Sequence, residues 1–412
     1  MNGRVLLFLP CAAGVEALLA DECTALGCTG VQAQRGGVQV PGDALLAMRL
    51  NLHSRLAQRV LWPLAAAGYR DENDLYELAR QVRWPDWITP AQTFAIATTA
   101  QRSPLKSLNF ATLRVKDAVC DVLRDASGER PSIDTQRPDL PLQLHLGATH
   151  ASIYVDSSGE PLFKRGWRDE RKGGVKGEAP LKETLAAALL AAAGWQGRAE
   201  DGALFDPCCG AGTIAIEAAQ IACAIAPGSA RRFAFERLLP FRDRSADWAR
   251  MKQAARDAQH AAAVPVFAGD VSFRMTDFAS RNAERAGVTQ AIEFKTADAL
   301  QRLAPAERGV MMLNPPYGER IDPKGSRGAT DLTRHARGQR EGFEGGASAA
   351  EFFSQLAAHW KRHYAGWTAW VLSPDARLPQ TLRLKESRRV PMWNGPIECR
   401  LFRFELVAGS AR

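Results

Sequence analysis

Two short stretches of this 412-residue chain combine residue types and spacings that could bind a ligand and act on it. Residues 206–213 (Asp-Pro-Cys-Cys-Gly-Ala-Gly-Thr) place a carboxylate ahead of one glycine pair, in the spacing Asp-x-x-x-Gly-x-Gly. The dinucleotide-binding pattern Gly-x-Gly-x-x-Gly holds a pyrophosphate instead. An acidic residue beside a glycine turn therefore favours a ligand that carries an amino group, such as S-adenosylmethionine. The alternative is a tight turn that binds nothing.

The second stretch, residues 314–318 (Asn-Pro-Pro-Tyr-Gly), follows the apolar run 309–313. Two consecutive prolines end a strand and stiffen the loop, because each fixes φ and lacks an N–H. Asn314 then presents a side-chain carbonyl oxygen, and the Pro315 carbonyl is a second acceptor. Such acceptors suit a planar amino group, while Tyr317 offers a flat face on which a base can stack. The alternative is a rigid surface loop.

The elements around these stretches alternate between strand and helix. Apolar runs typical of buried strands lie at 203–205, 264–270, 292–296 and 309–313, with helical patterns at 214–222 and 274–286. This alternation predicts a parallel, doubly wound α/β sheet, which binds ligands at the carboxyl ends of its strands. Asp270 ends the second strand, where a carboxylate can accept hydrogen bonds from both ribose hydroxyls of an adenosine. Asp298 follows the third strand and could meet the adenine amino group. Either residue could instead cap a helix.

Composition narrows the class of protein. Hydrophobic residues make up 46% of the chain and charged residues 24%, as in soluble globular proteins, and the length allows two or three domains. No apolar run approaches the roughly 20 residues that span a bilayer. The net charge of +8 favours a polyanionic partner. The eight cysteines form no Cys-x-x-Cys pair, so we expect no metal site and a reduced, cytoplasmic setting.

The first 160 residues predict two smaller units. Residues 1–54 follow the order strand, helix, hairpin, helix, which fits a ferredoxin-like unit. Residues 55–160 carry helical patterns at 74–82 and 105–124 and strand patterns at 93–99, 142–146 and 151–155. Six basic residues with interleaved aromatics follow in residues 163–176, a pattern that suits phosphate contacts; on charge alone a solvated linker fits equally well.

The residues that follow the second motif predict an insertion and then the last strands of the sheet. Residues 322–349 are glycine-rich, charged and poor in apolar residues, which predicts a mobile insertion. After a helix at 350–364 and a strand at 368–372, residues 382–390 and 401–407 predict a closing antiparallel pair around a turn at 394–396.

Three motifs together resemble a known family: Gly-Glu-Ala-Pro-Leu-Lys-Glu (177–183), the turn at 206–213, and Asn-Pro-Pro-Tyr-Gly-Glu-Arg (314–320). They are similar to the THUMP-containing guanine-N2 methyltransferases, most closely the RlmL type that acts on 23S rRNA, the large-subunit ribosomal RNA. The resemblance covers nearly the whole chain. It implies a ferredoxin-like unit (1–54), a THUMP-like RNA-binding domain (55–160) and a Rossmann-type, S-adenosylmethionine-dependent methyltransferase domain (161–412).

The resemblance also implies roles for individual residues. Those expected to hold the target guanine are Asn314, Pro315 and Tyr317. Those expected to bind S-adenosylmethionine, from its methionine end through its ribose to its adenine, are Glu178, Ala179, Pro180, Leu181, Asp206, Cys208, Gly210, Gly212, Asp270 and Asp298. Ser272 departs from the family, because relatives often have a second acidic residue there. Some relatives also carry a second, C-terminal methyltransferase; because this chain ends at Arg412, we expect only the guanine-N2 activity.

Three other functions remain as alternatives. A tRNA guanine-N2 methyltransferase shares the same layout, and only the closeness of the resemblance favours rRNA. A non-catalytic RNA-binding assembly factor is disfavoured because the chain retains the residues of both motifs. A DNA adenine methyltransferase shares the Asn-Pro-Pro-Tyr motif, but it offers no obvious use for the first 160 residues. The expected partner is RNA, with neither membrane nor metal.

Overall fold

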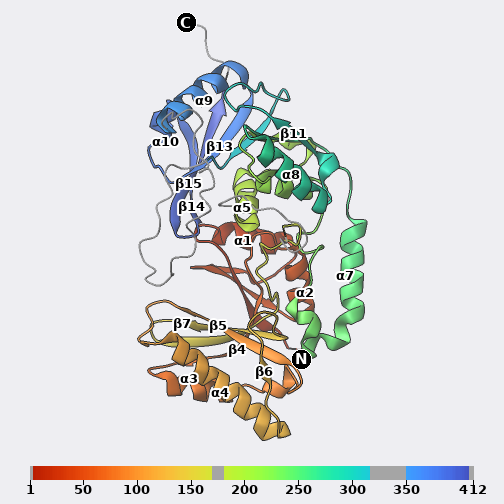
Figure 1. Ribbon diagram of the computed structural model, residues 1–412, viewed down its shortest axis with the longest axis vertical. Coiled ribbons are helices and arrows are strands. Elements are labelled where there is room, and N and C mark those ends of the chain that lie inside the picture. Colours follow the sequence, from red (N-terminus) through yellow and green to blue (C-terminus); the bar gives the residue numbers. More distant parts are fainter. Residues whose placement is uncertain (1–2, 169–180, 316–348, 408–412) are drawn as a thin grey trace, which may run out of the picture. The chain divides into compact units, whose positions relative to one another are not determined.

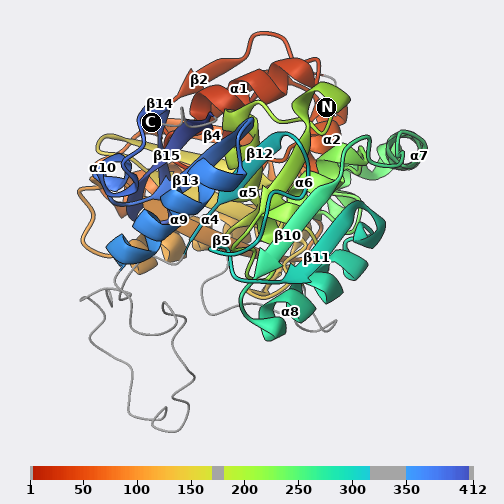
Figure 2. The same cartoon turned by 90° about the horizontal axis from the view of Figure 1, so that it is seen from above.

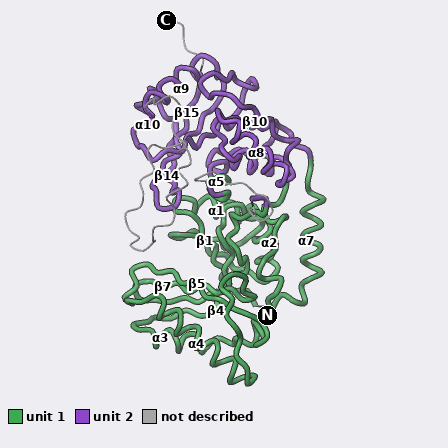
Figure 3. Tube along the Cα trace, in the orientation of Figure 1, with its two compact units in different colours: residues 1–166, 183–188, 224–260 green, residues 167–182, 189–223, 261–412 purple. Residues whose placement is uncertain are grey.

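The computed structural model describes residues 3–168, 181–315 and 349–407. By their contacts they form two compact units, shown in different colours in Figure 3. Unit 1 comprises residues 1–166, 183–188 and 224–260, and unit 2 comprises residues 167–182, 189–223 and 261–412. The predicted domain boundaries near residues 54 and 160 remain a prediction.

Unit 1 contains an eight-stranded sheet with the order β2-β3-β1-β4-β8-β7-β5-β6. The first part of the chain forms the predicted strand, helix, hairpin, helix series: β1 (Val5–Pro10), α1 (Glu16–Ala25), β2 (Gln32–Gln34), β3 (Gly37–Gly42) and α2 (Ala44–His53). Asp43 caps α2, because its side chain accepts a 2.9 Å hydrogen bond from the backbone nitrogen of Leu46. The local pattern therefore specified these elements closely.

The next part of the chain continues the same sheet. Its elements are β4 (Leu61–Gly68), α3 (Glu72–Arg80), η1 (Trp84–Asp86), β5 (Thr93–Ala100), α4 (Leu108–Ser127), β6 (Ser132–Ile133), β7 (Leu140–Leu146) and β8 (His150–Asp156). Strand β1 pairs with β4 through Phe8 and Leu61, so both sequence segments contribute to one sheet. Helices α3 and α4 contact each other, and both labels lie on one side of the sheet in Figure 1.

A later segment of the chain also belongs to unit 1. Residues 224–260 contain η4 (Ala234–Arg237), η5 (Leu239–Arg244) and α7 (Ser245–Asp257). Phe235 packs edge-to-face on Trp248 with ring centroids 5.0 Å apart, and Gly228 donates a 2.9 Å backbone hydrogen bond to Leu52. The sequence analysis assigned no element to this segment. Its contacts show that unit 1 is completed by residues that follow the glycine turn in the chain.

Unit 2 contains a seven-stranded sheet with the order β11-β10-β9-β12-β13-β15-β14 (Figure 2). Strands β11, β10, β9, β12 and β13 run parallel, and β15 pairs antiparallel with both β13 and β14. The strands are β9 (Ala203–Asp206), β10 (Val266–Asp270), β11 (Ile292–Thr296), β12 (Gly309–Leu313), β13 (Trp367–Ser373), β14 (Glu386–Asn394) and β15 (Ile397–Leu406). The predicted α/β fold class, with a parallel sheet and a closing antiparallel pair, is confirmed.

Helices cover both faces of this sheet. They are α6 (Thr213–Ala222), α8 (Phe273–Arg285), α9 (Ala349–His363) and α10 (Leu378–Leu382). Unit 2 also contains the short 3-10 helices η3 (Ala199–Asp201) and η6 (Thr289–Ala291). Helix α5 (Glu183–Ala193) contributes residues to both units. Alternate strand residues such as Phe205, Met311 and Val371 form one core with Trp360 of α9. Helix α6 contacts β9 and β10, and α8 contacts β10 and β11. The core thus holds β9, β10 and β12 rigidly.

One predicted strand is wrong at its start. Residues 382–390 were expected to be extended, but the chain forms α10 first, and β14 begins only at Glu386. Leu378 and Leu382 are each 1% exposed, and their separation by four residues lets both reach the core from one helix face. Pro379 fits the first turn of a helix.

None of the helices in the described ranges is long and apolar enough to cross a membrane.

Candidate active site

The predicted ligand-binding residues meet at one edge of the seven-stranded sheet. Asp206 and Asp270 are the last residues of β9 and β10, Asp298 lies two residues after β11, and Asn314 directly follows β12. Because these four strands are parallel and adjacent, their carboxyl ends lie along the same edge. The sheet order places Asp206 between Asp270 and Asn314.

Hydrogen bonds fix the turn that follows β9. The backbone nitrogen of Cys208 donates to Asp206 Oδ1 at 3.3 Å, and that of Cys209 donates to the Gly269 carbonyl at 2.8 Å. The backbone nitrogen of Gly210 donates to Asp270 Oδ2 at 3.0 Å. The turn is thus attached both to its own strand and to the neighbouring strand β10.

The two glycines of the turn serve different purposes. Gly210 has φ of +51°, and of the atoms in the described residues only the Met275 Cε, at 3.8 Å, would lie within 4 Å of a Cβ there. Gly212 has φ of +85°, and a Cβ there would lie 2.9 Å from the Cβ of Ala279 on α8. Gly210 therefore leaves room for a ligand to approach the backbone, whereas Gly212 lets α8 pack against the turn.

The Asp206 carboxylate at this edge is poorly hydrated. Asp206 is 1% exposed, and its burial raises its pKa well above the usual value, with the nearby charge of Asp270 adding to the shift. Burial raises the pKa of the Cys208 thiol, and the charges of Asp206, Asp270 and Asp298 raise it further. This accumulation of negative charge in a dry setting suits a ligand that carries positive charge.

Asp270 and Asp298 each hold backbone groups of their own loops. Asp270 Oδ1 accepts a 3.0 Å hydrogen bond from the Ser272 nitrogen; burial raises the Asp270 pKa, and the hydrogen bonds from Ser272 and Gly210 oppose that shift. Asp298 Oδ1 accepts a 2.8 Å hydrogen bond from Leu300. Each carboxylate therefore holds a turn of its own loop and does not cap a helix, because the N-cap of α8 is Ser272 and no helix of the described residues begins at Asp298.

Some predicted site residues lie outside the described residues. These are Glu178, Ala179, Pro180 and Tyr317. Leu181 is described and buried, and its carbonyl accepts a 3.4 Å hydrogen bond from Arg168 Nη1. The predicted insertion at 322–349 also lies outside the described residues, apart from Ala349, which begins α9.

The expected phosphate contact of the basic stretch 163–176 is wrong for Arg165. This side chain is 2% exposed, and its guanidinium donates to the carbonyls of Leu162 and Arg55 at 2.9 and 2.7 Å. A run of cations in sequence does not reveal which of them the fold turns inward. Arg165 supports the backbone of unit 1 instead.

The sequence analysis missed Arg302, which lies close to the strand ends. Its guanidinium donates a 3.1 Å hydrogen bond to the Ala268 carbonyl of β10 and lies 4.7 Å from the ring centroid of Phe205 on β9. Its own carbonyl accepts a 2.7 Å hydrogen bond from the Tyr364 hydroxyl. The loop that carries Asp298 is thereby attached to the sheet and to Tyr364, which directly follows α9. No local sequence pattern signals this role, because Ala268, Phe205 and Tyr364 are distant from Arg302 in the chain.

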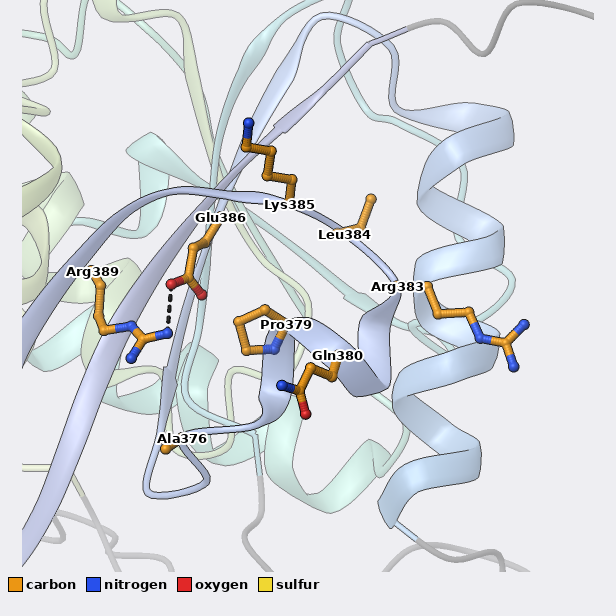
Figure 4. A pocket seen from close by; sticks show the side chains of 8 residues that line it. All are labelled: Ala376, Pro379, Gln380, Arg383, Leu384, Lys385, Glu386 and Arg389. Atoms are coloured by element: carbon orange, nitrogen blue, oxygen red, sulfur yellow. Dashed lines mark hydrogen bonds and ion pairs between the residues drawn. The ribbon is translucent and has the colours of Figure 1, made fainter.

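A separate surface hollow of about 400 Å³ lies between α10 and β14 (Figure 4). Glu386 and Arg389 form an ion pair of 2.5 Å within it. Its lining residues are Ala376, Pro379, Gln380, Arg383, Leu384, Lys385, Glu386 and Arg389. None of these belongs to the predicted site.

Proteins of known sequence or structure resemble this chain along nearly its whole length. A Syntrophotalea carbinolica protein named "Ribosomal RNA large subunit methyltransferase K/L" is 36% identical over 99% of this chain and 54% of its own length. The Synechocystis protein "Putative RNA methyltransferase slr0064" is 33% identical over 97% of this chain and 96% of its own. The crystal structure of SMU.472, "a putative methyltransferase complexed with SAH", superposes with a TM-score of 0.83 at 25% identity and covers all of both chains.

Family models match three consecutive segments. They are the RlmL ferredoxin-like domain at residues 6–61, the THUMP domain at 69–156, and the RMKL-like methyltransferase domain at 165–336. The fold and these matches define a Rossmann-type methyltransferase that also carries a ferredoxin-like and a THUMP domain. The chain belongs to the RMKL-like family of THUMP-containing methyltransferases, as the sequence motifs predicted. It spans about half the length of its relatives named K/L.

Proposed function

We propose that this chain uses S-adenosylmethionine to methylate the exocyclic N2 of a guanine in large-subunit (23S) rRNA. The observation that supports this most is the sheet edge at which Asp206, Asp270 and Asp298 lie beside the strand that leads to Asn314. The name that the K/L relatives carry favours large-subunit rRNA over tRNA. The predicted cytoplasmic location remains a prediction.

The described residues fit S-adenosylmethionine. Asp206 offers a buried carboxylate whose pKa is raised by burial. The positive charge of the methionine part would lower that pKa again and stabilise the ionised carboxylate. Gly210 leaves open space beside the turn, and Asp270, at the end of β10, is the expected partner of the ribose hydroxyls. Asp298 would meet the adenine edge. The solved relative SMU.472, which contains the demethylated product SAH, agrees with this cofactor.

The proposed chemistry is an in-line displacement. When bound, the cofactor supplies an electrophilic methyl group on a sulfonium sulfur. The guanine N2 attacks the methyl carbon, the carbon–sulfur bond breaks with its electron pair passing to sulfur, and N2 then loses a proton to solvent. Because the N2 lone pair is delocalised into the ring, hydrogen bonds from the amine to the Asn314 side-chain oxygen and the Pro315 carbonyl would localise it. Such positioning can contribute up to roughly 7–11 kcal/mol.

RNA recognition would combine base flipping with contacts to RNA shape. A guanine within a duplex must leave the stack to reach Asn314 and Tyr317. The THUMP domain at residues 69–156 would recognise the shape and backbone of the RNA, because the deep major groove of A-form RNA is hard to read. The net charge of +8 agrees with a polyanionic substrate.

Mapping of modified nucleosides by mass spectrometry tests the proposal. rRNA and tRNA from cells with and without the gene would be digested and compared. The proposal predicts that one N2-methylguanine disappears from large-subunit rRNA when the gene is absent. Loss of the same nucleoside from tRNA would favour the tRNA alternative, and an unchanged set of modifications in both RNAs would contradict a methyltransferase role.

A further inference from the structure

Two residues of α8, Asn282 and Ala279, contact the glycine turn. Asn282 is fully buried, and its Nδ2 donates a 2.9 Å hydrogen bond to the carbonyl of Ala211, which lies between the two glycines of the turn. One turn earlier on the same helix, Ala279 occupies the space that a Cβ on Gly212 would need. Helix α8 therefore fixes both the position and the orientation of the peptide groups at 211 and 212.

A second side chain determines which way the Asn282 amide faces. Arg285, the last residue of α8, donates through Nη2 to Asn282 Oδ1, and through Nε to the Trp167 carbonyl at 3.0 Å. A guanidinium can only donate hydrogen bonds, so the atom that faces it must be the amide oxygen. The amide nitrogen is then directed to Ala211. The pairing with Arg285 thus fixes the amide in the one orientation that holds the turn.

The same connection reaches the other predicted cofactor segment. The Arg168 guanidinium lies 4.7 Å from the ring centroid of Trp167, and it donates to the Leu181 carbonyl and to the Thr213 hydroxyl at the start of α6. Leu181 is the last of the four residues, 178–181, that the resemblance assigns to the methionine end of the cofactor. Side chains of residues 168, 282 and 285 therefore join the two segments that flank this end of the site.

We infer that Asn282 and Arg285 are positioning residues for the cofactor: Arg285 orients the Asn282 amide, and that amide holds the glycine turn in its binding conformation. Neither residue is expected to touch the reacting atoms. This positioning should favour cofactor binding through entropy, because a turn that is already ordered loses less conformational freedom when the cofactor binds. This inference rests on the proposed cofactor, S-adenosylmethionine.

The variant Asn282→Asp separates this role from a purely structural one. An aspartate has almost the same volume and keeps an acceptor for Arg285, but it brings a second oxygen to the Ala211 carbonyl in place of a donor. We expect affinity for S-adenosylhomocysteine, measured by titration calorimetry on the full chain, to fall at least about tenfold. Arg285→Met is a second variant at a half-buried position, expected to lower affinity less.

Gln220→Glu provides the matched control. Gln220, on α6, is also buried, and its amide nitrogen donates a 3.4 Å hydrogen bond to the Ala286 carbonyl just beyond α8. The same isosteric change there should also lower the melting temperature, because it buries a carboxylate. It should leave affinity for S-adenosylhomocysteine unchanged at temperatures where the protein is folded. A loss of stability alone therefore cannot explain a fall in cofactor affinity that Asn282→Asp shows and Gln220→Glu does not.

The combined variant tests the connection between the two residues. If Arg285 acts through the Asn282 amide, Arg285→Met should cost little further affinity in the Asn282→Asp background. Fully additive losses would overturn that part of the inference, and wild-type affinity in Asn282→Asp would overturn the whole. If the wild-type chain itself fails to bind S-adenosylhomocysteine, the proposed function fails instead, so the two failures are distinguishable.

Discussion

The Asp270 carboxylate accepts a 3.0 Å hydrogen bond from the backbone nitrogen of Gly210, sixty residues earlier in the chain. The residue expected to bind the ribose and the turn expected to wrap the cofactor are therefore parts of one hydrogen-bonded unit. The other Asp270 oxygen accepts from Ser272, which fixes the carboxylate plane. A change at Asp270 should consequently disturb the turn as well as the ribose contact.

We expect Asp270→Ala to weaken cofactor binding by about 1–3 kcal/mol for the unpaired ribose hydroxyls, and to loosen the turn in addition. Calorimetry with S-adenosylhomocysteine would measure this. Asp277→Ala is a suitable control, because Asp277 lies on α8 and forms an ion pair at the surface with Arg281, at 2.8 Å. Equal affinities for the wild type and Asp270→Ala would exclude Asp270 from the cofactor site.

Asp206→Asn should affect stability and binding in opposite directions. Burial raises the Asp206 pKa above its unfolded value, so the folded state favours the protonated carboxyl. That contribution to stability is complete below the unfolded pKa and is lost as the pH rises through the folded pKa. At neutral pH the ligand-free variant should therefore melt at a higher temperature than the wild type, and its melting temperature should vary less with pH.

The same variant should bind S-adenosylmethionine at least about tenfold more weakly, because it lacks the charge that pairs with the methionine part. Melting curves between pH 4 and 8 and calorimetry, on the same preparations, would test both effects. A melting temperature at or below that of the wild type at neutral pH would contradict the account of a strained, poorly hydrated carboxylate.

Gly212→Ala should be far more harmful than the same change at Gly287. Both glycines have positive φ, +85° and +72°, but only at Gly212 would the new Cβ collide, at 2.9 Å from that of Ala279. Gly287→Ala should cost about 1–2 kcal/mol of unfolding free energy, the price of left-handed backbone alone. Gly212→Ala should cost a further 1–3 kcal/mol or so and weaken cofactor binding.

Chemical denaturation of both variants would measure these differences. Adding Ala279→Gly to Gly212→Ala should recover the part of the loss that comes from the collision and leave the backbone part. If the two single glycine variants lose the same stability, the close approach of α8 to the turn is not as described.

Asn314→Ala should lower the rate of methyl transfer without lowering cofactor affinity. We expect the Asn314 oxygen to hold the target amine, so its removal should act on the transition state and reduce the single-turnover rate strongly. Tyr317→Ala should instead weaken capture of the base, by roughly 1–3 kcal/mol if stacking dominates. Near-wild-type turnover in Asn314→Ala at the same guanine would mean that other groups hold the amine.

The parts of the fold that could be predicted depend on local signals. The strand, glycine turn and helix around residues 206–213 follow from a short apolar run, turn residues and a helical pattern. The same holds for α2 with its Asp43 cap. The wrong strand at residue 382 arose because Leu378 and Leu382 fit either extended or helical periodicity in so short a segment.

The parts that escaped prediction depend on contacts between distant residues. Nothing local to residues 224–260 reveals that they pack with unit 1, because their partners lie far away in the chain. Asn282 looks like an ordinary polar helix residue, and its partner Ala211 is 71 residues away. Arg165 has the same charge as its neighbours, and only the folded chain distinguishes it as buried.

The most direct measurement of the central claim is the position of a transferred methyl group. The purified 412-residue chain would be incubated with S-adenosylmethionine carrying an isotope-labelled methyl group and with unmodified large-subunit rRNA. The RNA would then be digested and its nucleosides analysed by mass spectrometry. We predict that the label appears in N2-methylguanine at one site, and that tRNA in a parallel reaction remains unlabelled. Label in N6-methyladenine, or in no nucleoside although the chain binds the cofactor, would contradict the account.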